Sequence, residues 1–148
     1  GYRVTTVAER LKPERVFKAF LRYRQEIGIE ILPSDSRTMP MLIARAKEGC
    51  IVPLVADRDL SQNGIEVQFF GHKAKMPAGP VVIAQRAKVP LVGAFINYTP
   101  KGIKIQFEQI DVTDDVAESV QNVANFYERY LRKNPVDWHM MQRIWTND

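Results

Sequence analysis

Two carboxylates flank an arginine in the segment Asp57-Arg58-Asp59, directly after the apolar run 51–56. The run has the length of a strand, and ligands in open α/β sheets gather at the carboxyl ends of strands. Asp57 could orient a histidine or accept a hydrogen bond from a sugar, whereas Arg58 could position a phosphate-bearing substrate. A solvated loop whose charges neutralise one another has the same pattern. The triplet alone leaves both interpretations open.

Two arginines in the expected first helix are a second set of candidate ligands. Arg22 and Arg24 carry planar guanidinium groups, which suit phosphate recognition. Because successive helical residues diverge by about 100°, the two side chains cannot point the same way. A solvated helix face is typical of the same pattern. The basic residues around this helix could also face anionic lipid headgroups; they are Arg10, Lys12, Arg15, Lys18, Arg22 and Arg24.

The segment 72–79 contains small residues and prolines, and we expect it to form a rigid loop. Gly79 has no side chain, so a substrate could approach the backbone there. His72 has no acidic residue within four positions and is a poor candidate for a general base. His139 is more typical of a packed residue than of a catalytic one. The single cysteine, Cys50, and the two histidines lie far apart, which does not predict a zinc site.

Hydrophobic periodicity predicts strands that alternate with helices. The predicted strands are 2–8, 29–32, 51–56, 65–69, 91–96 and 103–107, and the predicted helices are 13–27, 39–48, 80–88 and a last helix capped by Thr113 and ended by Pro135. The run 51–56 is apolar on both sides, as a central strand would be. We expect one α/β sheet with some parallel pairs, in which 91–96 pairs with 103–107. The aromatic tail 138–145 is expected to dock back on this body.

The composition is that of one ordinary domain. The 148 residues are 45% hydrophobic and 26% charged, and no stretch approaches the ~20 apolar residues that a membrane span needs. A formal net charge of +4 suits an anionic partner such as a phosphorylated carrier, an acidic membrane surface or nucleic acid, without choosing among them. Nucleic-acid binding would require clustered basic and aromatic residues, and the sequence has no such local cluster.

Several segments together resemble the bacterial lipid A biosynthesis acyltransferase family over nearly the whole chain and in the same order. They are Val7-Ala8-Glu9-Arg10-Leu11-Lys12-Pro13-Glu14, Tyr23-Arg24-Gln25-Glu26, Ala56-Asp57-Arg58-Asp59-Leu60, Phe69-Phe70-Gly71, Met76-Pro77-Ala78-Gly79-Pro80 and Pro135-Val136-Asp137-Trp138-His139-Met140-Met141-Gln142. Within the family, the first and third segments look most like actinobacterial phosphatidylinositol mannoside acyltransferases.

The resemblance implies a glycerol-phosphate acyltransferase-like mixed sheet flanked by helices. It implies transfer of a fatty acyl group from an acyl thioester, on coenzyme A or acyl carrier protein, to a hydroxyl of a membrane glycolipid. The acceptor implied is a phosphatidylinositol mannoside, with lipid A as the alternative. The implied location is peripheral, on the cytoplasmic side of the cell membrane and against its anionic surface. The resemblance implies no cofactor, no metal and no nucleic-acid partner.

Enzymes of the family take their base from a His-X4-Asp motif, and the resemblance implies that Asp57 lies beside that histidine. Arg22 matches a family arginine best and Arg24 second. From their residue types and positions, Arg58, Asp59 and Gly79 are also expected to bind substrate. His-X4-Asp occurs nowhere in this sequence, because Pro77 follows His72 at that spacing and Ile144 follows His139. We therefore expect residues 1–148 to be the C-terminal part of one acyltransferase domain, inactive alone. The alternative from another class is a non-catalytic module that binds acyl chains or membranes.

Overall fold

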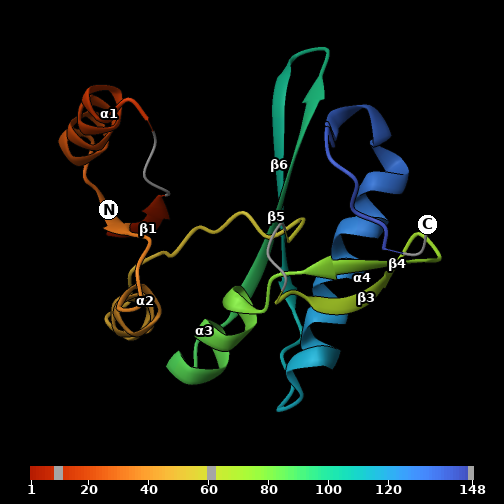
Figure 1. Cartoon of the computed structure of the whole chain (residues 1–148). Coiled ribbons are helices and arrows are strands. Elements are labelled where there is room, and N and C mark those ends of the chain that lie inside the picture. Colours follow the sequence, from red (N-terminus) through yellow and green to blue (C-terminus); the bar gives the residue numbers. More distant parts are fainter. Residues whose placement is uncertain (9–11, 60–62, 147–148) are drawn as a thin grey trace. The chain divides into compact units, whose positions relative to one another are not determined.

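The computed structural model describes residues 1–8, 12–59 and 63–146 (Figure 1). The chain forms two compact units. The first unit comprises Gly1–Val55 with Arg86–Val89, and the second comprises Ala56–Gln85 with Pro90–Asp148. Glu9, Arg10, Leu11 and Leu60, which belong to the segments of the family resemblance, lie outside the described residues.

The first unit contains two strands and two helices, β1 (Val4–Ala8), α1 (Glu14–Glu26), β2 (Ile29–Pro33) and α2 (Thr38–Lys47). β1 and β2 pair in parallel along their whole length, which confirms the expected parallel pairing. Gly28 has a φ of 83°, a left-handed conformation that favours glycine, and it ends the turn after α1 before β2 begins.

The apolar run 51–56 is not a central strand, so that prediction is wrong. Only Ile51 forms a bridge, to Val4, with its N–H donating to the carbonyl of Arg3 at 2.9 Å. Pro53 has no N–H to donate to a further ladder bond, which explains why pairing stops. Val55 is 89% exposed, so the run is not buried on both sides.

A partly buried polar cluster links β1, β2 and α2 of the first unit. The guanidinium of Arg45 donates to both oxygens of Glu30 at 2.6 and 2.8 Å, and the hydroxyl of Thr5 donates to the same carboxylate at 2.7 Å. The hydrogen bonds from Arg45, then from Thr5, lower the pKa of Glu30 to about 2. The cluster satisfies the side chain of Thr5, which is fully buried.

The second unit contains two hairpins and the longest helix. Its elements are β3 (Ile65–Phe69), β4 (His72–Met76), α3 (Gly79–Ala87, whose last two residues belong to the first unit), β5 (Leu91–Thr99), β6 (Gly102–Ile110), α4 (Val116–Lys133) and the 3-10 helix η1 (Pro135–Asp137). β5 and β6 pair antiparallel from Leu91↔Ile110 to Thr99↔Gly102, as the alternating pattern predicts. Among the described residues the strands form three two-stranded sheets, so the expected single sheet is wrong.

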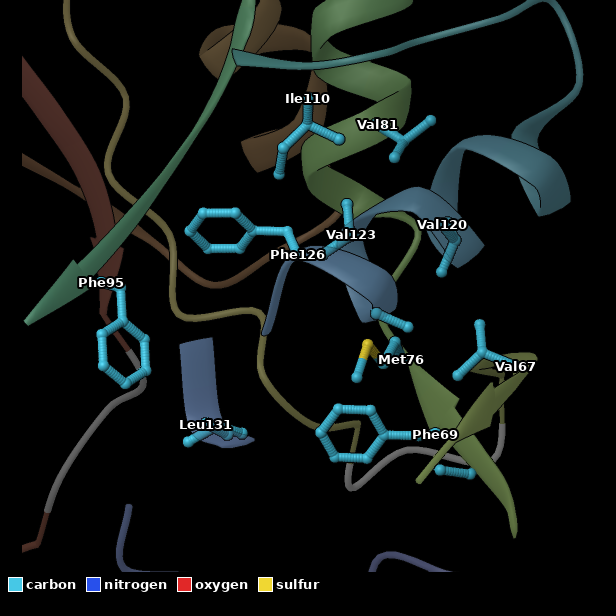
Figure 2. Close-up of a cluster of buried hydrophobic side chains, with 12 residues drawn as sticks. Val67, Phe69, Met76, Val81, Phe95, Ile110, Val120, Val123, Phe126 and Leu131 are labelled. Atoms are coloured by element: carbon cyan, nitrogen blue, oxygen red, sulfur yellow. The ribbon is translucent and has the colours of Figure 1, made fainter. Parts of the chain in front are cut away.

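The core of the second unit forms where α4 contacts both hairpins (Figure 2). Val120, Val123 and Phe126 lie on the buried stripe of α4. They join Phe69 and Met76 of the β3–β4 hairpin in one apolar cluster. Asp115, not Thr113, caps α4, because its carboxylate accepts the N–H groups of Ala117 and Glu118 at 2.7 and 3.3 Å. Asp115 takes this role because it directly precedes Val116, the first residue of the helix.

The expected loop 72–79 is wrong over its first five residues, which form β4. Phe70 and Gly71 both have positive φ, 55° and 81°, as a two-residue hairpin turn with the right twist requires. Glu128 of α4 accepts the N–H of Phe70 at 2.7 Å, and the guanidinium of Arg132 lies 5.0 Å from the Phe70 ring. The helix therefore holds this turn in its left-handed conformation.

One face of the β5–β6 hairpin is apolar and exposed. It consists of Val92, Ile96, Tyr98, Ile103, Ile105 and Phe107, all more than half exposed, whereas Phe95 on the opposite face packs against Tyr130 of α4. Within the described ranges, no helix combines the length and the apolar composition needed to span a bilayer.

Candidate functional site

Asp57 lies in the second unit, where the chain leaves the buried residue Ala56. The indole N–H of Trp138 donates to its Oδ2 atom at 2.9 Å. Its other oxygen, Oδ1, is buried and accepts no hydrogen bond from any described residue. A buried carboxylate oxygen without a donor costs stability, so such an atom requires an explanation. Asp57 is therefore a carboxylate held on one oxygen, with the other available to a donor.

Aromatic side chains lie on the side of this carboxylate that Trp138 occupies. The Trp138 ring meets Phe69 edge to face, with centroids 5.8 Å apart at 86°. Phe69 is only 1% exposed and belongs to the core of the second unit. Burial, and then the negative charge of Asp57, raise the pKa of Tyr127 to about 12. The electrostatic effect on Tyr127 indicates that this phenol lies within reach of the Asp57 charge in a weakly solvated region.

Arg58 turns toward the C-terminal segment. Its Nη1 atom donates to Oε1 of Gln142 and lies 4.0 Å from the sulfur of Met140. The guanidinium is thus held by residues more than 80 positions away in the sequence. The arginine predicted to position a phosphate therefore also anchors the loop to the tail.

Asp59 is hydrogen-bonded to the β3–β4 hairpin through its backbone. Its backbone N–H donates to the carbonyl of Lys75 at 3.1 Å. A Cβ added to Gly64 would lie 2.6 Å from Oδ2 of Asp59, which is closer than such atoms approach in real structures. Gly64 is therefore required for the observed position of Asp59, a role that the sequence pattern did not reveal.

The remaining predicted ligands lie elsewhere. Gly79 is the first residue of α3, not part of a loop, and belongs to the second unit together with Asp57, Arg58 and Asp59. Arg22 and Arg24 lie on α1 in the first unit. Arg22 is exposed, whereas the guanidinium of Arg24 lies 5.1 Å from the Phe20 ring on the same helix.

The two histidines and the cysteine do not form a site with one another. His72 is exposed on β4 and meets the Trp145 ring at 6.0 Å, and His139 is exposed in the tail. Cys50 is buried as a free thiol. Among the described residues, no three His, Cys, Asp or Glu side chains gather closely enough to hold a metal ion.

The C-terminal tail docks on the second unit, as its aromatic composition predicts. The indole N–H of Trp145 donates to the carbonyl of Phe69 at 3.1 Å, and the N–H of Thr146 donates to the carbonyl of Lys73 at 2.8 Å. The sequence indicated the tail and the Asp57 loop separately. The contact between Trp138 and Asp57 was missed, because it joins residues 81 positions apart.

A cavity of about 310 Å³ lies between the β5–β6 hairpin and the end of α4. Lys104, Arg129 and Lys133 contribute positive charge to its lining. Glu108 offsets part of this charge through an ion pair with Arg129. None of the predicted site residues lines this cavity.

Residues 1–147 match the family model described as bacterial lipid A biosynthesis acyltransferase. The chain belongs to this family. It is 37% identical to a phosphatidylinositol mannoside acyltransferase of Mycobacterium tuberculosis (strain H37Rv), over 97% of this chain and 47% of the relative. It is 35% identical to the protein of the same name from Mycolicibacterium smegmatis, over 97% of this chain and 49% of the relative. The chain spans about half the length of the curated relatives it matches.

Family membership confirms the resemblance that the sequence segments indicated. The mixed α/β architecture, with helices packed on small sheets, is compatible with an acyltransferase-like fold and confirms the fold class. The roles of the individual site residues remain predictions.

Proposed function

We propose that this chain is the C-terminal part of an enzyme that transfers a fatty acyl group from an acyl thioester to a hydroxyl of a membrane glycolipid. Its membership of the lipid A biosynthesis acyltransferase family supports the reaction class. The names of the mycobacterial relatives favour a phosphatidylinositol mannoside as the acceptor. A lipid A type acceptor is the alternative within the family.

Asp57 is the residue through which we propose that this chain takes part in the chemistry. The observation that supports it is the buried Oδ1 atom, to which no described residue donates, beside an Oδ2 atom already bound by Trp138. An imidazole N–H from the His-X4-Asp motif of the whole protein would donate to Oδ1. A carboxylate in this position holds the ring in one tautomer and stabilises the imidazolium that forms during transfer.

The proposed step conserves all atoms and protons. The imidazole removes the proton of the acceptor hydroxyl as its oxygen attacks the thioester carbonyl. A carbon–oxygen bond forms, the carbon–sulfur bond breaks, and the thiolate leaves with the proton that the imidazole returns. Because this chain lacks the histidine, we propose that it does not catalyse the transfer alone.

The other predicted ligands are assigned to substrate binding. Arg22 and Arg24 would each bind a phosphate of the donor or of the acceptor headgroup through their guanidinium groups. Arg58 would bind through N–H groups other than those on Nη1, which faces Gln142 and Met140. Asp59 would accept a hydrogen bond from a sugar hydroxyl. Gly79, which has no side chain, would let substrate approach the backbone at the first turn of α3.

We further propose that the whole protein acts at the cytoplasmic side of the membrane as a peripheral enzyme. The support is the density of basic residues on and before α1, of which Lys12, Arg15, Lys18, Arg22 and Arg24 are described. Such residues are attracted to anionic headgroups. The donor is acyl-coenzyme A or acyl carrier protein.

The test is acyl transfer from palmitoyl-coenzyme A, measured with this chain and with a longer protein that joins it to a His-X4-Asp motif. Phosphatidylinositol mannoside and a lipid A precursor are offered as acceptors in parallel. We expect transfer by the longer protein to the mannoside and none by this chain. A folded longer protein that is inert with both acceptors would overturn the enzyme assignment in favour of a non-catalytic module that binds acyl chains or membranes. Activity of this chain alone would contradict the role of the missing histidine.

A further inference from the structure

We propose that Trp138 is the positioning residue of Asp57, and that the segment 138–142 is a clamp that holds the loop 57–59 in its working conformation. This inference rests on the proposed function, because it explains how the carboxylate of Asp57 presents one chosen oxygen to an incoming donor. Trp138 itself would touch neither substrate nor the reacting atoms.

The indole ring selects which oxygen of Asp57 is used. An indole N–H is a donor only, so at 2.9 Å from Oδ2 it consumes that oxygen and leaves Oδ1 as the acceptor. Rotation about the Cβ–Cγ bond of Asp57 would otherwise exchange the two carboxylate oxygens. A hydrogen bond from a fixed donor removes that freedom and sets the direction from which an imidazole can approach Oδ1.

The donor is fixed because its ring packs against the core of the second unit. Trp138 meets Phe69 edge to face, and Phe69, the last residue of β3, is almost fully buried in a cluster with residues of α4. The short helix η1 ends directly before Trp138 and follows α4 with only Asn134 between them. The position of the indole N–H is therefore set by the fold of the second unit and not by a mobile surface side chain.

The segment 138–142 also contacts Arg58, so the loop 57–59 is held at a second point besides the hydrogen bond between Trp138 and Asp57. Arg58 donates to Oε1 of Gln142 and approaches the sulfur of Met140 at 4.0 Å. On the other side, the N–H of Asp59 donates to the carbonyl of Lys75. Consecutive residues of the loop are thus tied to the tail and to β4.

Docking of the tail does not by itself require a carboxylate partner. Trp145 is held in the same tail by donating to a backbone carbonyl, that of Phe69, at 3.1 Å. Trp138 instead bonds a carboxylate whose second oxygen is buried without a donor among the described residues. Such an arrangement costs stability and is explained if the second oxygen has a partner during function. Trp145 is accordingly the matched control, because its indole N–H lies in the same C-terminal tail, outside the segment 138–142, and bonds only the backbone.

The contact is tested first in this chain, without any activity measurement. The chain has two tryptophans, so a 1H–15N spectrum contains two indole N–H signals, assigned with Trp138→Phe and Trp145→Phe. We expect Asp57→Asn to shift the Trp138 signal upfield and to speed its hydrogen exchange at least ~10-fold, because a neutral amide oxygen is a weaker acceptor than a carboxylate. The Trp145 signal should remain unchanged. An unchanged Trp138 signal in folded Asp57→Asn would overturn the contact.

The consequence is tested by kinetics in the longer protein that contains a His-X4-Asp motif. Trp138→Phe keeps the aromatic packing on Phe69 and removes the N–H, so we expect kcat to fall roughly 10-fold or more while KM changes little. Trp145→Phe should leave kcat within about twofold. Both variants must match the parent in thermal unfolding for the comparison to hold. If Trp138→Phe fails to fold, the Asp57→Asn spectrum alone decides whether the contact exists.

The outcomes separate this inference from the proposed function. If Asp57→Ala abolishes transfer but a folded Trp138→Phe retains full kcat, the inference is overturned and the function stands. If Asp57→Ala retains full transfer, the role proposed for Asp57 fails, whatever the spectra show. If Trp138→Phe and Trp145→Phe lower kcat equally, the tail serves structure alone and the positioning role is refuted.

Discussion

Gly93 of β5 is the position where the structure predicts the sharpest effect of one added methyl group. A Cβ built on Gly93 would lie 2.6, 2.7 and 2.8 Å from three ring carbons of Phe126, closer than real Cβ atoms approach. Phe126 is 1% exposed and packs against Tyr127 and Tyr130, so its ring cannot move away freely. Overpacking of this kind costs about 1–3 kcal/mol, and we expect Gly93→Ala to lower the free energy of unfolding by about 2 kcal/mol.

The assay is urea unfolding of this chain, with a double-mutant cycle to isolate the clash. Phe126→Leu removes the ring atoms that the new methyl group would meet, so Gly93→Ala should cost at least ~1 kcal/mol less in that background than in the parent. Gly71→Ala is not a suitable control, because its positive φ adds strain. The reasoning is refuted if Gly93→Ala is as stable as the parent, or if its cost is the same with Leu at position 126.

Three further predictions concern ionisable and packed groups. Hydrogen bonds from Arg45, then from Thr5, lower the pKa of Glu30 to about 2, so the stability that this carboxylate contributes is present above pH 4.5 and is lost as pH falls toward 2. Glu30→Gln should therefore destabilise the chain by about 1 kcal/mol at pH 7 in urea unfolding and by much less at pH 2.5, and an equal loss at both pH values would contradict this. Gly64→Ala should displace Asp59 and raise KM of the longer protein several-fold, whereas unchanged kinetics would show that Asp59 does not contact substrate. Glu128→Gln should destabilise the β3–β4 turn by about 1 kcal/mol and speed amide exchange in that turn, and full protection in the variant would refute the role of α4 there.

Much of the local structure was predictable, because its signals are contained in neighbouring residues. The alternation along β5 and β6 predicts their pairing, and the apolar stripe of α4 predicts its buried face. Gly28 and Pro135 mark the ends of helices through their own backbone geometry. Such features depend on a few adjacent residues and need no knowledge of the fold.

The errors have physical reasons that lie in particular residues. Pro53 interrupts the ladder in an otherwise apolar run, so hydrophobicity alone overestimated the strand at 51–56. In β4 the outward lysines Lys73 and Lys75 conceal the alternation of Ala74 and Met76, both of which are buried. The positive φ values of Phe70 and Gly71 favour the hairpin turn. The sequence did not indicate them, because phenylalanine rarely adopts a positive φ.

The candidate site was predictable in its parts but not in its assembly. The Asp57-Arg58-Asp59 triplet and the aromatic tail were both recognisable from the sequence. Their contact depends on α4 returning the chain to the end of the 51–56 run, which is a property of the tertiary structure. Gly64 likewise acquires its role only once the chain brings it against Asp59.

The most direct test of the central claim is the rate of acyl transfer from palmitoyl-coenzyme A to a phosphatidylinositol mannoside by the longer protein carrying Asp57→Asn. Asp114→Asn is the matched control, because Asp114 is an exposed aspartate outside the site. We predict that Asp57→Asn lowers kcat at least ~100-fold with unchanged folding, whereas Asp114→Asn retains the parental rate. Equal rates for the parent and for folded Asp57→Asn would contradict the account.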